Sequence, residues 1–289
     1  MGSNGPLLCT LDQPQTTLGG PVELAGEGVF TGRPCRVRLE PASADHGLVL
    51  AVQGHRIPVR ADRLITHPNR STLVAEGDPT VGANMVEHVL SALHGLGVDN
   101  TLIHVEGGEC PLGDGSSLAY VEGIAAVGVQ SVGGPRRVLR VEGSARFVAD
   151  SGAWLEVGPP AGDGLTIDYR LDYGHPVIGQ ADVHYDLTPG IYADLIAPAR
   201  TFIPIEEAER LVALGVLRST DATTCLVVYP DRTNFPLRVP QEFAAHKVLD
   251  LIGDLRLCGY SVQASLRGYR SGHGLNHEAA RWLAAQAEP

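Results

Sequence analysis

The sequence predicts an α+β fold built from two similar halves, and three observations lead to this prediction. Many short segments alternate polar and apolar residues and end in turn residues, which is typical of strands. A few longer segments have helical periodicity and run into glycine. Strands precede helices twice along the chain, which favours two α+β layers over one alternating parallel sheet.

The strand predictions rest on alternation and on one continuous apolar run. That run, at residues 224–228, has the composition of a buried strand. The alternating segments lie at residues 37–41, 48–52, 100–105, 137–141, 154–157 and 166–171.

The helix predictions rest on periodicity and on stop signals. Gly97, Gly215 and Gly259 follow three of the predicted helices as natural C-terminal stops, and Pro240 suits a first turn. The predicted helices span residues 83–96, 117–126, 205–214, 240–258 and 276–287.

Glycine and proline concentrate at residues 129–135, and a strand pattern restarts directly after them. This segment is therefore predicted to be a linker between an N-terminal domain, residues 1–133, and a C-terminal domain, residues 134–289. A faint internal echo agrees with that boundary, because residues 87–97 resemble residues 246–253.

Composition excludes several classes of protein. The 289 residues contain 33 Asp and Glu against 22 Lys and Arg, a formal net charge of −11, which argues against a nucleic-acid-binding protein. A local basic pocket could still bind an anionic small molecule. No apolar run reaches the ~18 residues of a membrane span, so stable membrane insertion is not expected. The five scattered cysteines suit reduced thiols, and the predicted compartment is the cytoplasm.

The segment from His246 to Asp254 has the strongest chemical pattern. On a helix, His246, Asp250 and Asp254 form one stripe among apolar residues, where acidic groups are costly to bury without a compensating charge or metal. A His and an Asp four residues apart can both reach one Zn²⁺. A solvated polar stripe is the alternative interpretation.

Two further segments carry candidate catalytic groups. His88 could bind a metal while its neighbour Glu87 flanks the reacting water, although the pair also suits a core histidine beside an exposed acid. His273 lies between two glycines, where a loop could present it as a general acid. A turn histidine is the other interpretation.

Together these segments resemble the zinc-dependent UDP-3-O-acyl-N-acetylglucosamine deacetylases of lipid A biosynthesis. The resemblance covers nearly the whole chain, and several independent motifs occur in the family's order. They lie at residues 15–18, 26–32, 86–93, 95–100, 109–116, 197–202, 246–254 and 271–276. The resemblance implies two α+β domains, each with a strand layer against helices, and an active site between them.

The resemblance also implies a ligand set and a base. His88, His246 and Asp250 would hold the zinc ion and leave its fourth position open, as catalytic zinc requires, and the same donors also suit iron(II). Glu87 would be the general base that activates the attacking water.

Five more residues receive roles from the same resemblance. The Thr201 hydroxyl would stabilise the oxyanion, and protonated His273 would act as an electrostatic stabiliser or as general acid toward the leaving amine. Asp254 would orient His273, Lys247 would assist the substrate electrostatically, and Phe202 would line the sugar side. The implied substrate is a UDP-linked acylated amino sugar, whose acyl chain would lie along an insert near residues 190–217.

The chain departs from the family pattern where the acyl chain or nucleotide sugar would be recognised. Phe30 replaces a usual His, Ile203 replaces a usual Gly, and residues 218–224 differ from the family's stretch. None of these positions is a predicted metal ligand or the base. Two alternatives therefore stand beside the lipid A deacetylase: a paralogue acting on another N-acetylated sugar, and a non-catalytic descendant that binds a sugar nucleotide or a partner protein.

Overall fold

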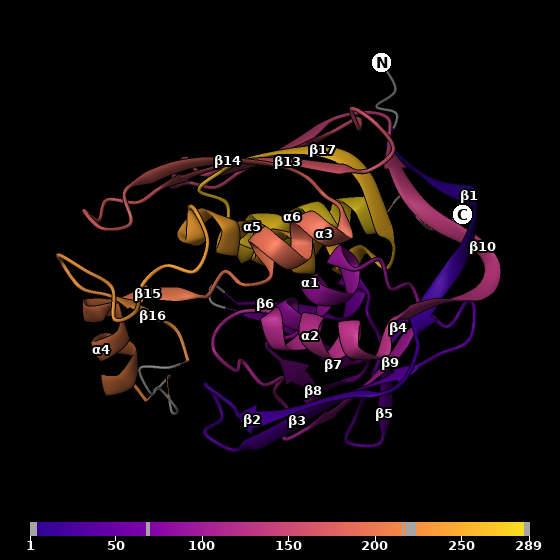
Figure 1. Ribbon diagram of the computed structural model, residues 1–289, viewed down its shortest axis with the longest axis horizontal. Helices are drawn as coiled ribbons and strands as arrows, with labels where there is room; N and C mark the ends of the chain where they lie inside the picture. The colour runs from indigo at the N-terminus through magenta and orange to yellow at the C-terminus, as the bar shows by residue number, and fades with distance from the viewer. Residues whose placement is uncertain (1–4, 68–69, 216, 218–223, 286–289) are drawn as a thin grey trace.

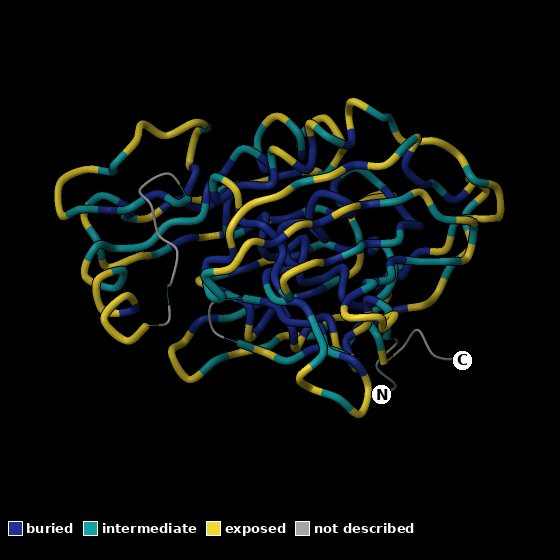
Figure 2. Tube along the Cα trace, turned by 90° about the horizontal axis from the view of Figure 1, so that it is seen from below, coloured by how far each residue is buried: buried dark blue, intermediate teal, exposed yellow. Residues whose placement is uncertain are grey.

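A computed structural model describes residues 5–67, 70–215, 217 and 224–285 of the chain. Helices occupy the middle of the molecule, with a sheet above them and other sheets below (Figure 1). Figure 2 shows that the buried chain segments concentrate in this middle region, while the exposed segments are mostly peripheral. The α+β prediction is therefore confirmed.

The upper layer is a seven-stranded sheet in the order β1-β10-β17-β12-β11, with β13 beside β17 and β14 beside β13. Its inward residues alternate with exposed ones, as in β13, where Leu165, Ile167 and Tyr169 are buried. Its strands are β1 (Pro6–Leu18), β10 (Val129–Val141), β11 (Ala145–Val148), β12 (Trp154–Gly158), β13 (Leu165–Asp172), β14 (Gln180–Asp186) and β17 (Ser261–Tyr269).

The lower layer contains two sheets. The first has the order β2-β3-β9-β4-β5 and consists of β2 (Val22–Glu27), β3 (Pro34–Pro41), β4 (Leu48–Val52), β5 (His55–Pro58) and β9 (Thr101–Glu106). The second is a meander of β6 (Leu64–His67), β7 (Arg70–Ala75) and β8 (Asp78–Asn84), preceded by the short helix η1 (Ala61–Arg63).

The helices between the sheets include α1 (Glu87–Gly95) and α5 (Glu242–Leu255), which pack against each other. Every residue of α1 and nearly every residue of α5 is buried, so the polar side chains of these helices need partners inside the protein. Helix α5 continues into η3 (Arg256–Cys258), and the other helices of this layer are α2 (Leu118–Val127), α3 (Pro189–Ile191), η2 (Tyr192–Ile196) and α6 (His273–Ala284). Among the described residues, no helix is both long and apolar enough to cross a membrane.

A small unit extends to one side of the layers (Figure 1). It contains the parallel pair β15 (Phe202–Pro204) and β16 (Leu226–Val228), with α4 (Ile205–Ala213) beside them. β15 and α4 lie within the predicted insert at residues 190–217, and β16 lies beyond it in sequence.

The predicted linker at residues 129–135 is wrong, because this segment forms the first half of β10. Gly133 and Gly134 have positive φ angles of 81° and 67°, and the pairing of β10 with β1 shifts register around them. The glycines therefore mark an irregularity inside a long paired ribbon. The division of the chain at residues 133 and 134 falls inside β10 and stays a prediction.

Candidate metal centre and active site

The packing of α1 on α5 brings the chemical groups together. The Ser91 hydroxyl donates to the Leu249 carbonyl at 2.8 Å, and His94 Nδ1 donates to the Ile252 carbonyl at 3.0 Å. At Gly253 the helices nearly touch, since a Cβ there would lie 2.1 Å from the Glu87 carbonyl oxygen. The start of α1 is thereby held against the C-terminal half of α5.

Three side chains from these helices form a candidate metal centre. Asp250 Oδ1 lies 3.5 Å from His246 Nε2 and 3.9 Å from His88 Nε2. The three possible ligand atoms lie within 4.8 Å of one another, and all three residues are buried. This spacing suits simultaneous coordination of one ion.

The second nitrogen of each imidazole fixes which atom faces the centre. His246 Nδ1 lies 3.1 Å from the Ala199 carbonyl, and His88 Nδ1 lies 3.4 Å from the Ser116 carbonyl. A carbonyl oxygen can only accept, so each Nδ1 carries the proton and each Nε2 keeps a lone pair. Outer hydrogen bonds of this kind orient metal-binding histidines, so the donor set fits a divalent ion.

The protonation states agree with metal binding. Burial lowers the pKa of His246 to about 3 and also lowers the pKa of His88, so both rings are neutral near pH 7. Burial alone would raise the pKa of Asp250, but the neighbouring histidines and Lys247, whose Nζ lies 3.1 Å from Oδ2, lower it overall. Neutral imidazole and ionised carboxylate are the forms that coordinate metals.

Glu87 begins α1 next to His88 and is 1% exposed. Its Oε2 accepts a hydrogen bond from the backbone N–H of Ser71 at 3.0 Å. Burial raises the pKa of Glu87 to about 8, with His273 opposing this shift and the Asp254 and Asp250 charges adding to it. A carboxylate with a raised pKa is a stronger base than a solvated one.

His273 forms an ion pair with Asp254. Its Nδ1 lies 2.8 Å from Asp254 Oδ2, and its Nε2 lies 4.0 Å from Asp250 Oδ2. Burial disfavours the charged imidazole, but the carboxylates of Asp254, Asp250 and Glu87 outweigh burial and raise the pKa of His273 to about 9. The ring is therefore protonated near neutral pH. His273 is the first residue of α6, so the prediction that a loop presents it is wrong.

A second group of possible ligands, Asp254, His273 and His277, also lies close together. The Asp254 oxygens are already engaged, since Oδ1 accepts from the Ser71 hydroxyl at 2.5 Å and Oδ2 from Asn276 at 2.9 Å. His273 also uses Oδ2. The first group, with two unengaged Nε2 atoms, is therefore the better metal site.

The candidate centre opens into a pocket of about 510 Å³. Thr201, Phe202 and Lys247 lie on its wall together with Glu87 and His273. Of the predicted site residues, only Asp254 does not line this pocket, because it lies behind His273.

Aromatic packing fixes one wall of the pocket. The Phe202 ring lies 4.9 Å from the Phe243 ring and 5.7 Å from the Tyr173 ring. Lys247 Nζ lies 5.5 Å from the centre of the Phe202 ring. This wall presents an apolar ring beside a cation.

The departures from the family pattern also face this pocket. Phe30 and Ile203 both line it, and the Arg70 guanidinium lies 4.2 Å above the Phe30 ring. Residues 218–223 lie outside the described chain, while Thr224 lines the pocket.

Sequence reasoning missed the residues that hold Asp254. Ser71 contacts Asp254 through its hydroxyl and Glu87 through its N–H, and His277 Nε2 lies 2.7 Å from the Ser71 hydroxyl. Ser71 belongs to β7, far from Asp254 in sequence, so no spacing rule could have linked the two. Met85, another residue of the pocket wall, has a positive φ of 59°, a strained conformation of the kind that gathers at functional sites.

Known proteins of one family are similar to this chain over nearly its whole length. Residues 15–285 match the family model described as UDP-3-O-acyl N-acetylglycosamine deacetylase. A protein named UDP-3-O-acyl-N-acetylglucosamine deacetylase from Oleidesulfovibrio alaskensis is 34% identical over 280 residues, covering 95% of this chain and 90% of the relative.

Two further relatives carry the same name. The protein from Vibrio atlanticus is 32% identical, covering 95% of this chain and 91% of its own length. The protein from Brucella ovis is 32% identical, covering 93% of this chain and 94% of its own. Since the family model spans nearly the whole chain and such relatives exceed 30% identity, this chain belongs to the UDP-3-O-acyl N-acetylglycosamine deacetylase family.

Proposed function

We propose that this protein hydrolyses the N-acetyl group of UDP-3-O-acyl-N-acetylglucosamine and releases acetate, a step of lipid A biosynthesis. The observation that supports this most strongly is the convergence of the three possible ligands with Glu87 and His273 in one pocket. The family model and the names of the relatives supply the substrate class. The scattered free cysteines favour the cytoplasm as its compartment.

In this proposal His88, His246 and Asp250 hold Zn²⁺. Bound there, the ion supplies a Lewis acid that polarises the amide carbonyl and makes water more acidic. The neutral imidazoles and the ionised carboxylate support this assignment. Iron(II) is the competing ion for such donors, and metal analysis of protein purified without added metal decides between them.

Glu87 is the general base. Its carboxylate accepts a proton from the water that attacks the acetamide carbonyl carbon. The Ser71 N–H fixes one carboxylate oxygen, which leaves the other for this proton. Glu87 is adjacent to a proposed ligand without being one, so its removal should affect turnover more than metal binding.

Thr201 and His273 act on the tetrahedral intermediate. The Thr201 hydroxyl donates to the oxyanion that develops on the carbonyl oxygen. His273 Nε2–H transfers its proton to the amide nitrogen as the C–N bond breaks, which yields acetate and the free amine. Asp254 holds the ring through Nδ1, and Lys247 adds positive charge near the substrate.

The rest of the pocket would select the substrate. We propose that Phe202 lies against the sugar and that the insert at residues 190–217 borders the acyl chain, since Leu211 and Leu217 extend the pocket lining. The halves 1–133 and 134–289 would then meet at the site, because α1 belongs to the first half and α5 to the second.

A second candidate is the same chemistry on another N-acetylated sugar. It is favoured by Phe30 and Ile203, which place two bulky apolar side chains in the pocket lining where the family pattern has His and Gly. Added bulk of this kind reshapes a pocket and shifts its substrate preference.

Acetate release distinguishes these candidates. We expect the zinc-loaded protein to release acetate from UDP-3-O-acyl-N-acetylglucosamine, with the Glu87→Ala variant as blank, and to prefer it over N-acetylated sugars without the acyl chain. Turnover only of another N-acetylated sugar would support the second candidate. If the protein has zinc demonstrably bound and turns over none of these sugars, both candidate functions are contradicted and a binding protein is favoured.

A further inference from the structure

A second pocket lies away from the candidate active site, and the two share no lining residue within the described chain. Its volume is about 690 Å³, a size typical of small-molecule sites. Its walls come from the segment before β4, the start of η1, the η3–β17 junction and the end of α6. It therefore lies where elements from the two ends of the chain meet.

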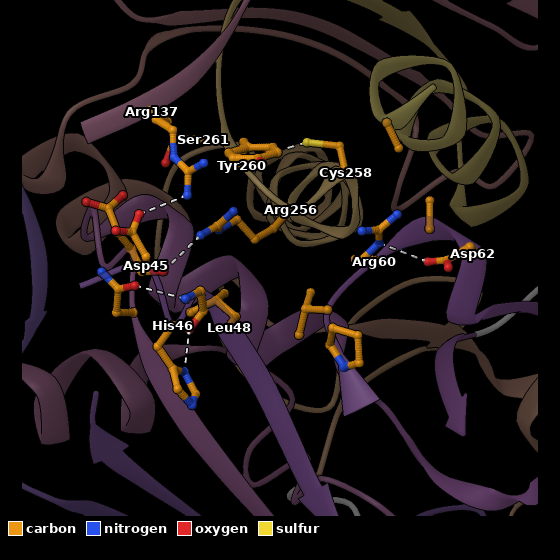
Figure 3. A pocket seen from close by; sticks show the side chains of 18 of the residues that line it. Asp45, His46, Leu48, Arg60, Asp62, Arg137, Arg256, Cys258, Tyr260 and Ser261 are labelled. Atoms are coloured by element: carbon orange, nitrogen blue, oxygen red, sulfur yellow. Dashed lines mark hydrogen bonds and ion pairs between the residues drawn. The ribbon is translucent and has the colours of Figure 1, made fainter. Parts of the chain in front are cut away.

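A buried arginine reaches into this pocket. Figure 3 shows the Arg256 side chain extending into the space between Tyr260 on one side and Asp45 and His46 on the other. Arg256 is 2% exposed, and its Nε and Nη1 atoms are buried without a hydrogen-bond partner. Its Nη2 has one long contact, 3.4 Å to the Asp99 carbonyl oxygen. A buried guanidinium with unsatisfied donors is costly unless an acceptor is supplied.

The carboxylate of Asp99 does not satisfy this guanidinium. Asp99 Oδ1 accepts from Arg136 Nε at 3.0 Å, and Oδ2 accepts from the backbone and hydroxyl of Thr16 at 3.0 and 3.1 Å. Asp99 is thus directed toward Arg136 and offers Arg256 its backbone oxygen instead.

Other arginines surround the same space. Arg137 and Arg60 are paired with carboxylates, at 2.9 Å to Asp45 and 3.3 Å to Asp62. Arg281 donates to two neutral oxygens, Thr66 Oγ1 at 3.0 Å and the Leu64 carbonyl at 3.4 Å, and no carboxylate pairs with it among the described residues. Arg256 and Arg281 therefore leave positive charge in the pocket.

We propose that this pocket binds the phosphate group of a small molecule, with Arg256 and Arg281 as its anchors. Nε and Nη1 lie on different edges of the guanidinium, so an anion with several acceptor oxygens satisfies them better than a single atom. Arginine recognises phosphate through such multiple charge-assisted hydrogen bonds. Because both nitrogens are covered, a lining side chain must turn aside when the ligand enters.

Calorimetric titration of the zinc-loaded protein with inorganic phosphate tests this proposal. We expect saturable binding that Arg281→Gln weakens roughly tenfold and Arg256→Met removes, since each loses a charge-assisted contact. Arg36→Gln, which removes another exposed arginine, on β3, and Lys247→Gln, in the other pocket, should leave this binding intact.

Two results would overturn the proposal. The first is equal phosphate affinity in the wild type, Arg281→Gln and Arg256→Met. The second is no phosphate binding by the wild type, which would mean that water alone occupies the pocket. If Arg256→Met does not fold, the exposed Arg281→Gln decides by itself. If glycerol 3-phosphate binds more tightly than phosphate, the phosphate group comes from a phosphorylated metabolite. If glycerol 3-phosphate binds more weakly than phosphate, the ligand is the free phosphate ion.

Discussion

Asp250 carries the charge that the proposed metal centre requires. Its carboxylate faces both histidines and also accepts from Lys247. Asp250→Ala should therefore lose tightly bound zinc, because two neutral imidazoles alone bind it weakly. Metal analysis after dialysis measures this, with Asp168→Ala, an exposed aspartate on β13, as control. Stoichiometric zinc retained by Asp250→Ala would place the ligands elsewhere.

Glu87 should matter to turnover and not to metal content. Glu87→Gln keeps an oxygen for the Ser71 N–H but cannot accept the proton of water, so the rate of acetate release should fall by roughly 100-fold or more. Zinc content should match the wild type. Near-normal turnover by Glu87→Gln would show that another group is the base.

We expect His94 to make the folded protein less stable in acid. Burial, with the positive charges of Arg256 and Arg136, lowers the pKa of His94 to about 3. In the unfolded chain a His has a pKa near 6.5. Between about pH 3 and 6.5 the unfolded state therefore binds more protons than the folded state, and the free energy of unfolding falls as the pH falls. The free energy of unfolding falls by up to ~1.4 kcal/mol per pH unit.

His94→Asn tests this, because its amide can still donate to the Ile252 carbonyl. Urea unfolding of the zinc-loaded protein between roughly pH 4 and 6 should give a shallower fall of the unfolding free energy in the variant than in the wild type. Identical slopes would mean that other groups dominate the acid response.

At the scale of elements, the close approach of α1 and α5 sets the geometry of the site. Gly253→Ala would bring a Cβ to 2.1 Å from the Glu87 carbonyl oxygen, and backbone cannot yield as a flexible side chain can. The helices must separate, which should cost roughly 1–3 kcal/mol of unfolding free energy and lower turnover by displacing Glu87.

Urea unfolding and acetate release measure the two effects of Gly253→Ala. Gly162→Ala is the control, since Gly162 is exposed, does not line the candidate active-site pocket, and a Cβ there meets nothing within 4 Å. An unchanged unfolding free energy and turnover in Gly253→Ala would show that the contact between the helices is looser than the structure has it.

The elements that the sequence predicted well have local signals. Residues 48–52 match β4, and the helices predicted at 117–126 and 205–214 match α2 and α4 within about a residue, because periodicity and terminal glycines mark them. Strand β1 went unpredicted, since its alternation is irregular and its partner β10 lies more than 100 residues away. Long-range pairing of this kind leaves no local pattern.

At the scale of the whole molecule, the fold explains why the proposed site could be predicted in part. The motifs at residues 87–88 and 246–254 carry their own spacing, and the packing of α1 on α5 joins them. The contacts of Ser71 and His277 with Asp254 depend on how β7 and α6 meet α5, which no single segment encodes.

The proposal that His88, His246 and Asp250 hold a zinc ion that the reaction needs is tested most directly by removing and restoring the metal. Chelation followed by dialysis should abolish acetate release from UDP-3-O-acyl-N-acetylglucosamine, and adding zinc should restore it up to about one ion per chain. The Asp250→Ala variant should not recover. Unchanged acetate release by the metal-free protein, or full recovery by Asp250→Ala, would contradict the account.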